Sequence, residues 1–192
     1  MIYTPKMMMA VRFSIRTHEI YQKQKRKGKD VAYITHPLTV GMILARAGAD
    51  EDVIIAGTLH DTIEDSIKEK KVTRELLEKK FGARVANIVE SVTEDITIKS
   101  WEEKKRQALE HVEHFSHESL LVKSADVIAN GAELIDDYAK GGEPIFARFG
   151  AGKKRMLENQ LAVIAAILAK WKGNPLSPDL NELAKNLIHM LG

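Results

Sequence analysis

Residues 53–65 read VIIAGTLHDTIED, an apolar run that ends in four ionisable residues. The apolar part predicts a helix that crosses a hydrophobic core, and charged groups at its end are costly unless something compensates them. On a helix, residues four apart lie on one face, so His60 is expected beside Glu64 and Asp61 beside Asp65. All four side chains could then line one side of a cleft. A divalent cation is the usual compensation, and imidazole with carboxylate suits Mn, Fe or Zn.

Two further segments contain side chains of the same ligand types. Residues 33–38 read YITHPL and place His36 near a helix N-terminus, while residues 123–130 read KSADVIAN and place Asp126 in an apolar helical face. Together with the pair at 60 and 61, they make two histidines and two aspartates drawn from three predicted helices. This set suits an octahedral divalent ion that keeps positions for water and substrate.

Each of these segments also has an ordinary explanation when it is taken alone. The ionisable run could be an exposed helix end, His36 a simple helix cap, and Asp126 a buried carboxylate that a neighbour satisfies. The combination of all of them in one chain favours the metal site.

Helical periodicity runs through nearly the whole chain, and no segment alternates like a strand. Asp50, Thr73 and Ser100 are predicted helix caps, Ser116 or Ser119 another, and Pro37 is expected to open a helix after a cap at Thr35 or His36. The sequence therefore predicts an all-α domain of about nine or ten helices. The expected helices cover about 6–22, 37–47, 51–65, 74–82, 83–92, 101–113, a stretch from 117 or 120 onward, 154–172, and a last one that ends near 191.

Bulk composition restricts the class of protein. The 192 residues suffice for one sizeable core, the net charge is only +2, and there is no cysteine. Disulfides and thiol chemistry are thereby excluded, and the charge does not argue for nucleic acid or a membrane. Residues 1–15 contain no apolar stretch of signal-peptide type. We expect a soluble, cytoplasmic protein, and the sequence leaves its oligomeric state open.

At this point the chain resembles the HD-domain metal-dependent phosphohydrolases. Within them it is similar to the hydrolase domain of RelA/SpoT-type alarmone enzymes and their short stand-alone relatives, which act in the stringent response. The resemblance implies an HD-domain helical bundle and a single domain over 1–192, with the motif-bearing core at about 8–140 and C-terminal helices at 141–192. The matching stretches are 26–27, 33–38, 56–65, 92–95 and 123–130, in the order that the family has.

The resemblance also implies a site and a reaction. The metal, commonly Mn²⁺, would be held by His36, His60, Asp61 and Asp126. Glu64 and Asp65 match the acidic pair associated with hydrolysis, Arg26 a basic residue that flanks the purine, and Asn130 a position that faces the ribose. The implied substrate is guanosine tetra- or pentaphosphate (ppGpp or pppGpp), which is cleaved at the 3′-diphosphate to release pyrophosphate.

Basic residues could neutralise that diphosphate. Lys104, Lys105 and Arg106 are candidates, although consecutive helix positions face different ways and only one or two can contribute. Lys27 lies in a basic loop, 23–29, which is either solvated or a grip on phosphate.

Other readings of the sequence stay open. The segment Val127-Ile128-Ala129 departs from the family pattern, so the substrate could be another phosphorylated nucleotide. A non-catalytic nucleotide-binding regulator is a further alternative. His18 is expected to support the site or the packing rather than to bind metal, and His111, His114 and His117 are more typical of a solvated helix face than of a second metal site.

Overall fold

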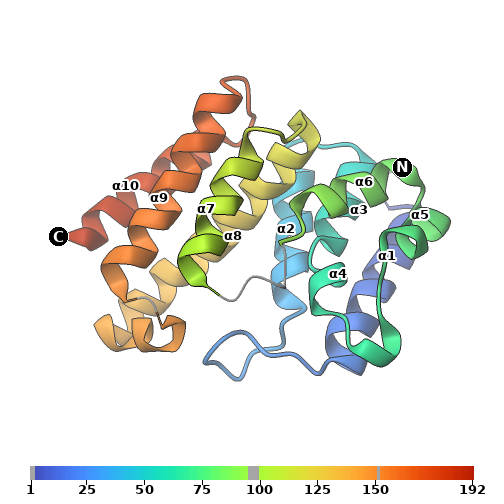
Figure 1. Cartoon of the computed structure of the whole chain (residues 1–192), viewed down its shortest axis with the longest axis horizontal. Coiled ribbons are helices and arrows are strands. Elements are labelled where there is room, and N and C mark those ends of the chain that lie inside the picture. The colour runs from blue at the N-terminus through green and yellow to red at the C-terminus, as the bar shows by residue number, and fades with distance from the viewer. Residues whose placement is uncertain (1–2, 95–99, 151) are drawn as a thin grey trace. The chain divides into compact units, whose positions relative to one another are not determined.

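The structure is a computed structural model, and it describes residues 3–94, 100–150 and 152–192. Within these residues the chain forms ten α-helices, one π-helix and two short 3-10 helices, and no strand (Figure 1). The prediction of an all-α fold with nine or ten helices is confirmed. The chain divides into two compact units, Met1–Glu94 and Asp95–Gly192. The assignment of all 192 residues to one domain stays a prediction.

Helix α3 (Glu51–Leu59) lies at the centre of the first unit and packs against α1, α2 and α6. Ile55, Ala56 and Leu59 are fully buried, which explains why this helix is apolar all round. The remaining elements of the unit are α1 (Pro5–Ile15), the π-helix (Arg16–Tyr21), α2 (Thr35–Arg46), α4 (Thr62–Asp65), a 3-10 turn (Lys68–Lys70), α5 (Arg74–Phe81) and α6 (Ala83–Val92).

Helices α2 and α3 form a tight antiparallel pair that positions the candidate site. A Cβ atom on Gly57 would lie 2.2 Å from Leu44 Cδ1, and one on Gly41 would lie 2.7 Å from Thr58 Oγ1, so the glycines permit the close approach. The two helices are joined by a short turn, in which Gly48 has a φ of +77°. The start of α2 is therefore brought beside the end of α3.

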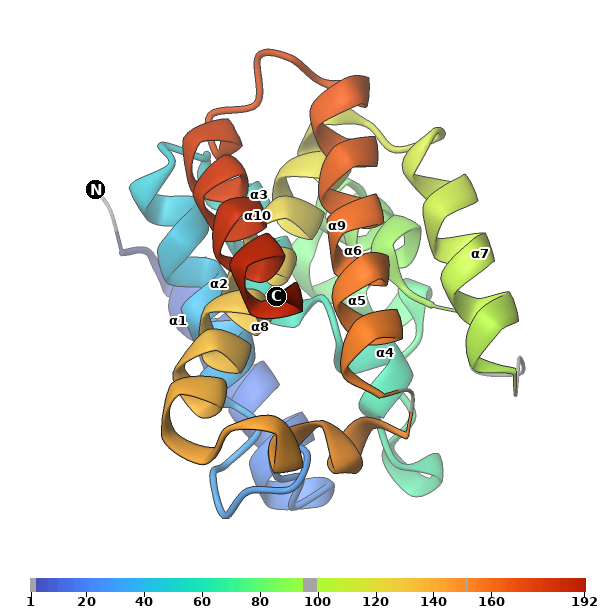
Figure 2. The same ribbon diagram turned by 90° about the vertical axis from the view of Figure 1, so that its left-hand side faces the viewer.

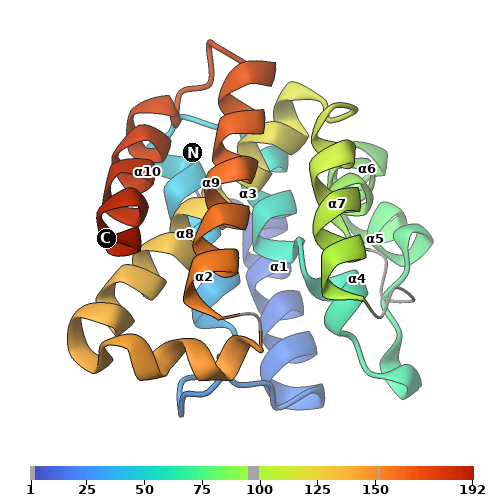
Figure 3. The same ribbon diagram turned by 60° about the vertical axis from the view of Figure 1, so that its left-hand side comes forward.

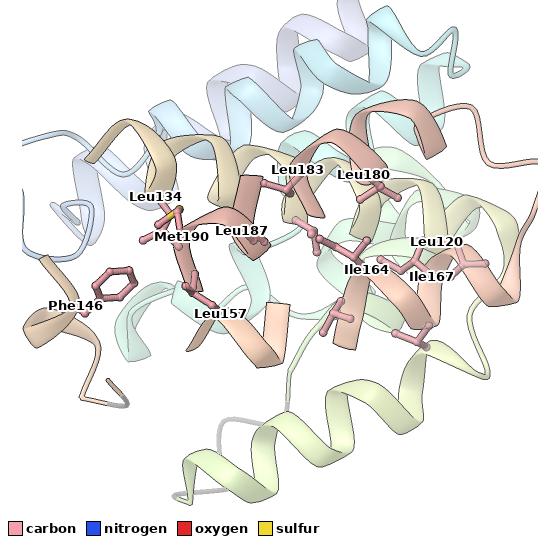
Figure 4. Packing of buried hydrophobic residues seen from close by; sticks show 13 residues of the cluster. Leu120, Leu134, Phe146, Leu157, Ile164, Ile167, Leu180, Leu183, Leu187 and Met190 are labelled. Atoms are coloured by element: carbon pink, nitrogen blue, oxygen red, sulfur yellow. The ribbon is translucent and has the colours of Figure 1, made fainter. Parts of the chain in front are cut away.

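The second unit is a helical bundle around a long helix, α8 (His117–Gly141). The other elements are α7 (Trp101–Val112), a 3-10 segment (Glu143–Phe149), α9 (Lys153–Lys170) and α10 (Ser177–Leu191). Helices α9 and α10 lie side by side and both pack against α8, while α7 packs against α9 (Figures 2 and 3). Leucine and isoleucine side chains from α8, α9 and α10 fill the core, together with Phe146 (Figure 4).

Most predicted caps are confirmed. The side chains of Asp50, Thr73, Ser100 and Ser116 accept hydrogen bonds from backbone N–H groups of the first turns of α3, α5, α7 and α8. The predicted cap at the start of α2 is wrong. That helix begins at Thr35, without a side-chain cap, because the turn at 32–34 already supplies the carbonyls that accept from the N–H groups of Thr35 and His36.

Two predicted helices are interrupted where the sequence suggested continuity. The first is α-helical only to Ile15 and continues as a π-helix, which changes the phase of its buried face. Ala10, Ser14 and His18 are therefore buried, while Ile20 is 58% exposed. The helix predicted through residue 65 ends at Leu59, and a separate turn, α4, carries Glu64 and Asp65.

Candidate metal centre

Two histidines and one aspartate meet within the first unit. His36 lies in the first turn of α2 and His60 directly follows α3, and their rings are 5.1 Å apart, edge to face. The Nε2 atoms of His36 and His60 lie 3.7 Å and 3.1 Å from the same Asp61 Oδ2 atom. Both histidines are buried, and Asp61 is mostly so. Three of the four predicted ligands are thus brought together by the α2–α3 pair.

The orientation of His60 makes this arrangement suitable for a cation. Its Nδ1 lies 2.8 Å from the carbonyl oxygen of Gly57, an acceptor, so Nδ1 carries the hydrogen in the neutral ring. The Nε2 atom then presents a lone pair towards the carboxylate of Asp61. The Nε2 atom of His60 and the carboxylate of Asp61 are then two acceptors that face each other in a buried place, which is compatible with a metal ion between them. Histidines that bind metals typically have a hydrogen-bond partner for the other ring nitrogen, as the Nδ1 atom of His60 has in the carbonyl of Gly57. The donor set therefore fits a divalent metal.

Tyr33 also lies at this cluster, and the sequence alone did not single it out. Its hydroxyl group donates a hydrogen bond of 2.5 Å to Asp61 Oδ2. Its ring lies 5.1 Å from the ring of His18 and 5.9 Å from that of His36, so it is packed between the two. Tyr33 comes three residues before His36, and the turn before α2 brings both side chains to the same end of the helix. This spacing could have indicated that Tyr33 lies near the cluster.

Glu64 and Asp65 lie on α4, after the break in the helix that was predicted to carry them together with His60 and Asp61. The two carboxyl groups have different hydrogen-bond partners. Glu64 accepts a hydrogen bond from the backbone N–H of Glu94, and Asp65 accepts one of 2.9 Å from the side-chain amide of Gln24. The acidic pair is therefore fixed by two separate contacts.

Burial changes the protonation of both carboxyl groups. Desolvation raises the pKa of Glu64 to about 7, although the hydrogen bond from Glu94 opposes the shift. Burial and the neighbouring charge of Asp61 also raise the pKa of Asp65, against the hydrogen bond from Gln24. A carboxyl group that titrates near neutral pH can take up or release a proton there, as general acid–base chemistry requires.

Asp126 and Asn130 lie one turn apart on α8, in the second unit. Asn130 donates a hydrogen bond of 2.6 Å to Asp126 Oδ1, and Lys123 Nζ lies 2.9 Å from Asp126 Oδ2. The carboxylate is thus held by one neighbour on each side. Its part in the metal site, and that of Asn130 in ribose binding, stay predictions.

The predicted substrate-binding cations differ in their surroundings. The guanidinium of Arg26 lies over the ring of Tyr33, 5.3 Å from its centroid, whereas Lys27 is exposed in the loop. On α7, Arg106 is 59% exposed and pairs with Glu103 and Glu110, both at 2.5 Å. Lys105 is partly buried on the same helix, and the side chain of Lys104 lies outside the described part of the structure.

The remaining histidines are accounted for by packing or by exposure. His18 is completely buried in the π-helix, where its Nδ1 lies 3.0 Å from Gln24 Oε1. His111 and His114 are exposed, and the ring of His117 stacks on Trp171 at 4.4 Å. The expectation that the trio at 111, 114 and 117 is not a second metal site stays a prediction.

No helix within the described ranges is long and apolar enough to cross a membrane.

Comparison with protein families gives a match to the HD domain model over residues 10–157. A Danio rerio protein named guanosine-3′,5′-bis(diphosphate) 3′-pyrophosphohydrolase MESH1 is 39% identical over 133 residues, which cover 68% of this chain and 70% of that protein. The human protein of the same name is 34% identical over 131 residues, which cover 67% of this chain and 69% of that protein.

Solved structures agree with the fold. A metazoan ortholog of SpoT that hydrolyses ppGpp superposes with a TM-score of 0.76 at 24% identity, over 95% of this chain and 96% of that one. A Listeria monocytogenes protein superposes with a TM-score of 0.71 at 30% identity, over 81% of this chain and 97% of that one.

Proposed function

The chain belongs to the HD domain family, and on that premise we propose that it hydrolyses guanosine 3′,5′-bis(diphosphate) at the 3′-diphosphate and releases pyrophosphate. The names of the zebrafish and human relatives support this substrate and this reaction. The observation that carries the proposal is the convergence of His36, His60 and Asp61, with both Nε2 atoms directed at one carboxylate oxygen. We place the enzyme in the cytoplasm and in the stringent response, as expected from the sequence.

The proposed cofactor is a divalent metal, most simply Mn²⁺. His36, His60 and Asp61 would hold it, and we propose Asp126 as the fourth ligand because of its place in the family pattern. When bound, the ion would lower the pKa of a water ligand and stabilise the negative charge on a phosphoryl oxygen. Tyr33, through its hydrogen bond to Asp61, would keep that ligand in one orientation.

The acidic pair would handle the water and its proton. In the proposed reaction the water oxygen bonds to the phosphorus atom attached to the ribose 3′ oxygen, and the bond from that phosphorus to the 3′ oxygen breaks. Asp65, which accepts a hydrogen bond from Gln24, would orient the water. Glu64, whose pKa is raised to about 7 by burial, is suited to accept the proton and pass it on near neutral pH. The products are pyrophosphate and a guanosine 5′-diphosphate with a free 3′ hydroxyl.

Basic and polar residues are proposed to bind the nucleotide. Arg26, held over Tyr33, would flank the purine, and Lys27 would contact phosphate. Asn130 is assigned to the ribose. Of the α7 candidates, we favour Lys104 and Lys105 for the diphosphate over Arg106, because two glutamates already compensate the charge of Arg106.

The direct test measures pyrophosphate release from guanosine tetraphosphate by the purified protein with fresh Mn²⁺, together with the metal content by elemental analysis. We expect turnover, and we expect His60→Ala to lose both activity and metal. His189→Ala, at an exposed position of α10, is the matched control and should retain both. Intact substrate after incubation would reject the proposal, and a parallel screen of phosphorylated nucleotides would show whether another one is cleaved. Binding without turnover would identify a regulator.

A further inference from the structure

We propose that His18 and Gln24 are positioning residues for Asp65, and that the His18 ring fixes which end of the Gln24 side-chain amide faces that carboxylate. The functional part of this proposal rests on the proposed hydrolase activity and on the role assigned to Asp65 in it. The structural part rests on a chain of three side chains inside the first unit. None of the three is a proposed metal ligand.

The hydrogen bonds of this chain have a defined direction. Gln24 Nε2 lies 2.9 Å from Asp65 Oδ2, and Gln24 Oε1 lies 3.0 Å from His18 Nδ1. A carboxylate only accepts, so the NH₂ end of the amide must face Asp65 and its carbonyl end must face the histidine. The carbonyl also only accepts, so Nδ1 of His18 must carry a hydrogen. The ring therefore donates to Gln24, and Gln24 donates to Asp65.

The surroundings of His18 favour the neutral ring in this tautomer. The side chain has no exposed surface, and burial lowers its pKa. Its Nε2 atom is buried and has no hydrogen-bond partner among the described residues. With the hydrogen on Nδ1, the ring donates its one N–H to Gln24 rather than leaving that N–H unpaired inside the protein. A ring kept for packing alone would not need an Nδ1 donor.

The backbone around Gln24 holds its side chain in this place. The N–H of Gln24 donates to the carbonyl of His18 at 2.9 Å, and the N–H of Tyr33 donates to the carbonyl of Gln24 at 2.9 Å. Lys23, just before it, has a φ of +50°, an uncommon conformation for a residue with a side chain. This sharp turn after the π-helix brings Gln24 back to the ring six residues earlier. Such irregularities are frequent where a side chain must be aimed.

One buried ring thus supports two carboxylates. His18 reaches Asp65 through Gln24, and it packs against Tyr33, whose hydroxyl group donates to Asp61. The packing contact needs only the ring, whereas the Gln24 contact needs a donor at Nδ1. The two roles can therefore be separated by substitution.

The test uses two amide substitutions at the same position. The amide nitrogen of asparagine reaches the place of Nδ1, so His18→Asn retains a donor to Gln24, whereas the longer side chain of His18→Gln carries its amide past that place. We expect His18→Gln and Gln24→Met to lower kcat for the proposed substrate by about 10- to 100-fold, with KM and metal content nearly unchanged. His18→Asn should stay within a few-fold of the wild type. Circular dichroism and thermal unfolding would show whether each variant folds.

The matched pair of His18 variants is the readout that a packing role would not change. Equal loss of kcat in His18→Asn and His18→Gln would overturn the positioning role, because packing does not depend on a donor at the place of Nδ1. An unchanged kcat in Gln24→Met would overturn it as well.

The tautomer can be measured without any enzymatic activity. Nitrogen-15 NMR of the histidine rings, in protein loaded with diamagnetic Zn²⁺, should show His18 as neutral with its hydrogen on Nδ1. A hydrogen on Nε2 would overturn the proposal even in an active enzyme. If the wild type does not cleave the nucleotide but this tautomer is observed, the proposed activity has failed and the hydrogen-bond assignment stands.

Discussion

The surroundings of Glu64 change its chemistry. Burial raises its pKa from 4.5 to about 7, so the folded metal-free protein retains a proton there that the unfolded chain has lost. Ionisation of this group therefore opposes folding. As the pH rises from about 4.5 to about 7 the contribution of Glu64 to stability falls, and above about 7 it is constant.

The corresponding prediction concerns Glu64→Gln, which cannot ionise and can still accept from the N–H of Glu94. The quantity to compare is the unfolding free energy of the metal-free variant minus that of the metal-free wild type. This difference should be about 2–3 kcal/mol more positive at pH 8 than at pH 4.5, since one pKa unit corresponds to about 1.4 kcal/mol. Urea unfolding at both pH values measures the difference. Glu69→Gln, on an exposed turn, serves as the control. A Glu64→Gln difference that is the same at both pH values would show that this carboxyl group is not buried.

Tyr33 gives a second prediction at the level of one residue. Tyr33→Phe removes the hydroxyl group that donates to Asp61 but keeps the ring that packs between His18 and His36. Because loss of a hydrogen bond to a metal ligand typically weakens binding 10- to 100-fold, we expect the Kd for Mn²⁺ to rise by about that factor. Competition with a metal-sensitive dye measures it. Tyr138→Phe, in the second unit, is the matched control, and an unchanged Kd in Tyr33→Phe would mean that Asp61 needs no such support.

At the scale of helices, Asp50 combines two stabilising roles. Its carboxylate caps α3 by accepting from the N–H groups of Asp52 and Val53, and it pairs with both terminal nitrogens of Arg84 on α6, at 3.0 and 2.6 Å. The guanidinium of Arg84 also lowers the pKa of this carboxyl group. The same side chain therefore starts the helix that carries His60 and ties it to its neighbour.

Asp50→Ala should destabilise the protein by about 1–2 kcal/mol. The cap contributes about 1 kcal/mol, and the largely exposed ion pair with Arg84 adds at most about as much because solvent screens it. Denaturant unfolding of Asp50→Ala and Arg84→Ala separates the two, since Arg84→Ala removes the ion pair and leaves the cap. Equal losses in both variants would assign the whole effect to the ion pair.

The helices also show what the sequence could predict. Caps such as Asp50, Thr73 and Ser116 were found correctly because a cap depends on a few neighbouring residues. The meeting of His36 and His60 could be anticipated from their pattern, and the glycines that let α2 and α3 approach explain it.

The interruptions were missed because they depend on tertiary contacts rather than on local composition. Nothing in residues 16–21 indicates a π-helix, and nothing in residues 53–65 indicates that the helix ends at Leu59. The same limit applies to Gln24, since its contact with Asp65 spans 41 residues of sequence. Periodicity located the acidic residues but could not show that their partners differ.

At the scale of the whole molecule, metal binding should stabilise the folded state. His36, His60 and Asp61 all belong to the first unit, where α2 and α3 hold them together only in the folded chain. An ion that binds the folded state alone adds about 2.7 kcal/mol when its concentration is 100 times its Kd. For a chain of this length that corresponds to a rise of Tm by about 5–11 °C.

We therefore expect Mn²⁺ to raise the Tm of chelator-treated protein by this amount and EDTA to reverse the rise, as measured by differential scanning calorimetry. Should the two units unfold in separate transitions, the shift belongs to the transition of residues 1–94, because these contain the three clustered donors. His60→Ala should abolish the shift, and His189→Ala should retain it. A shift that survives in His60→Ala would place the stabilising ion elsewhere, because removal of one buried ligand nitrogen from so small a cluster leaves too few donors for tight binding.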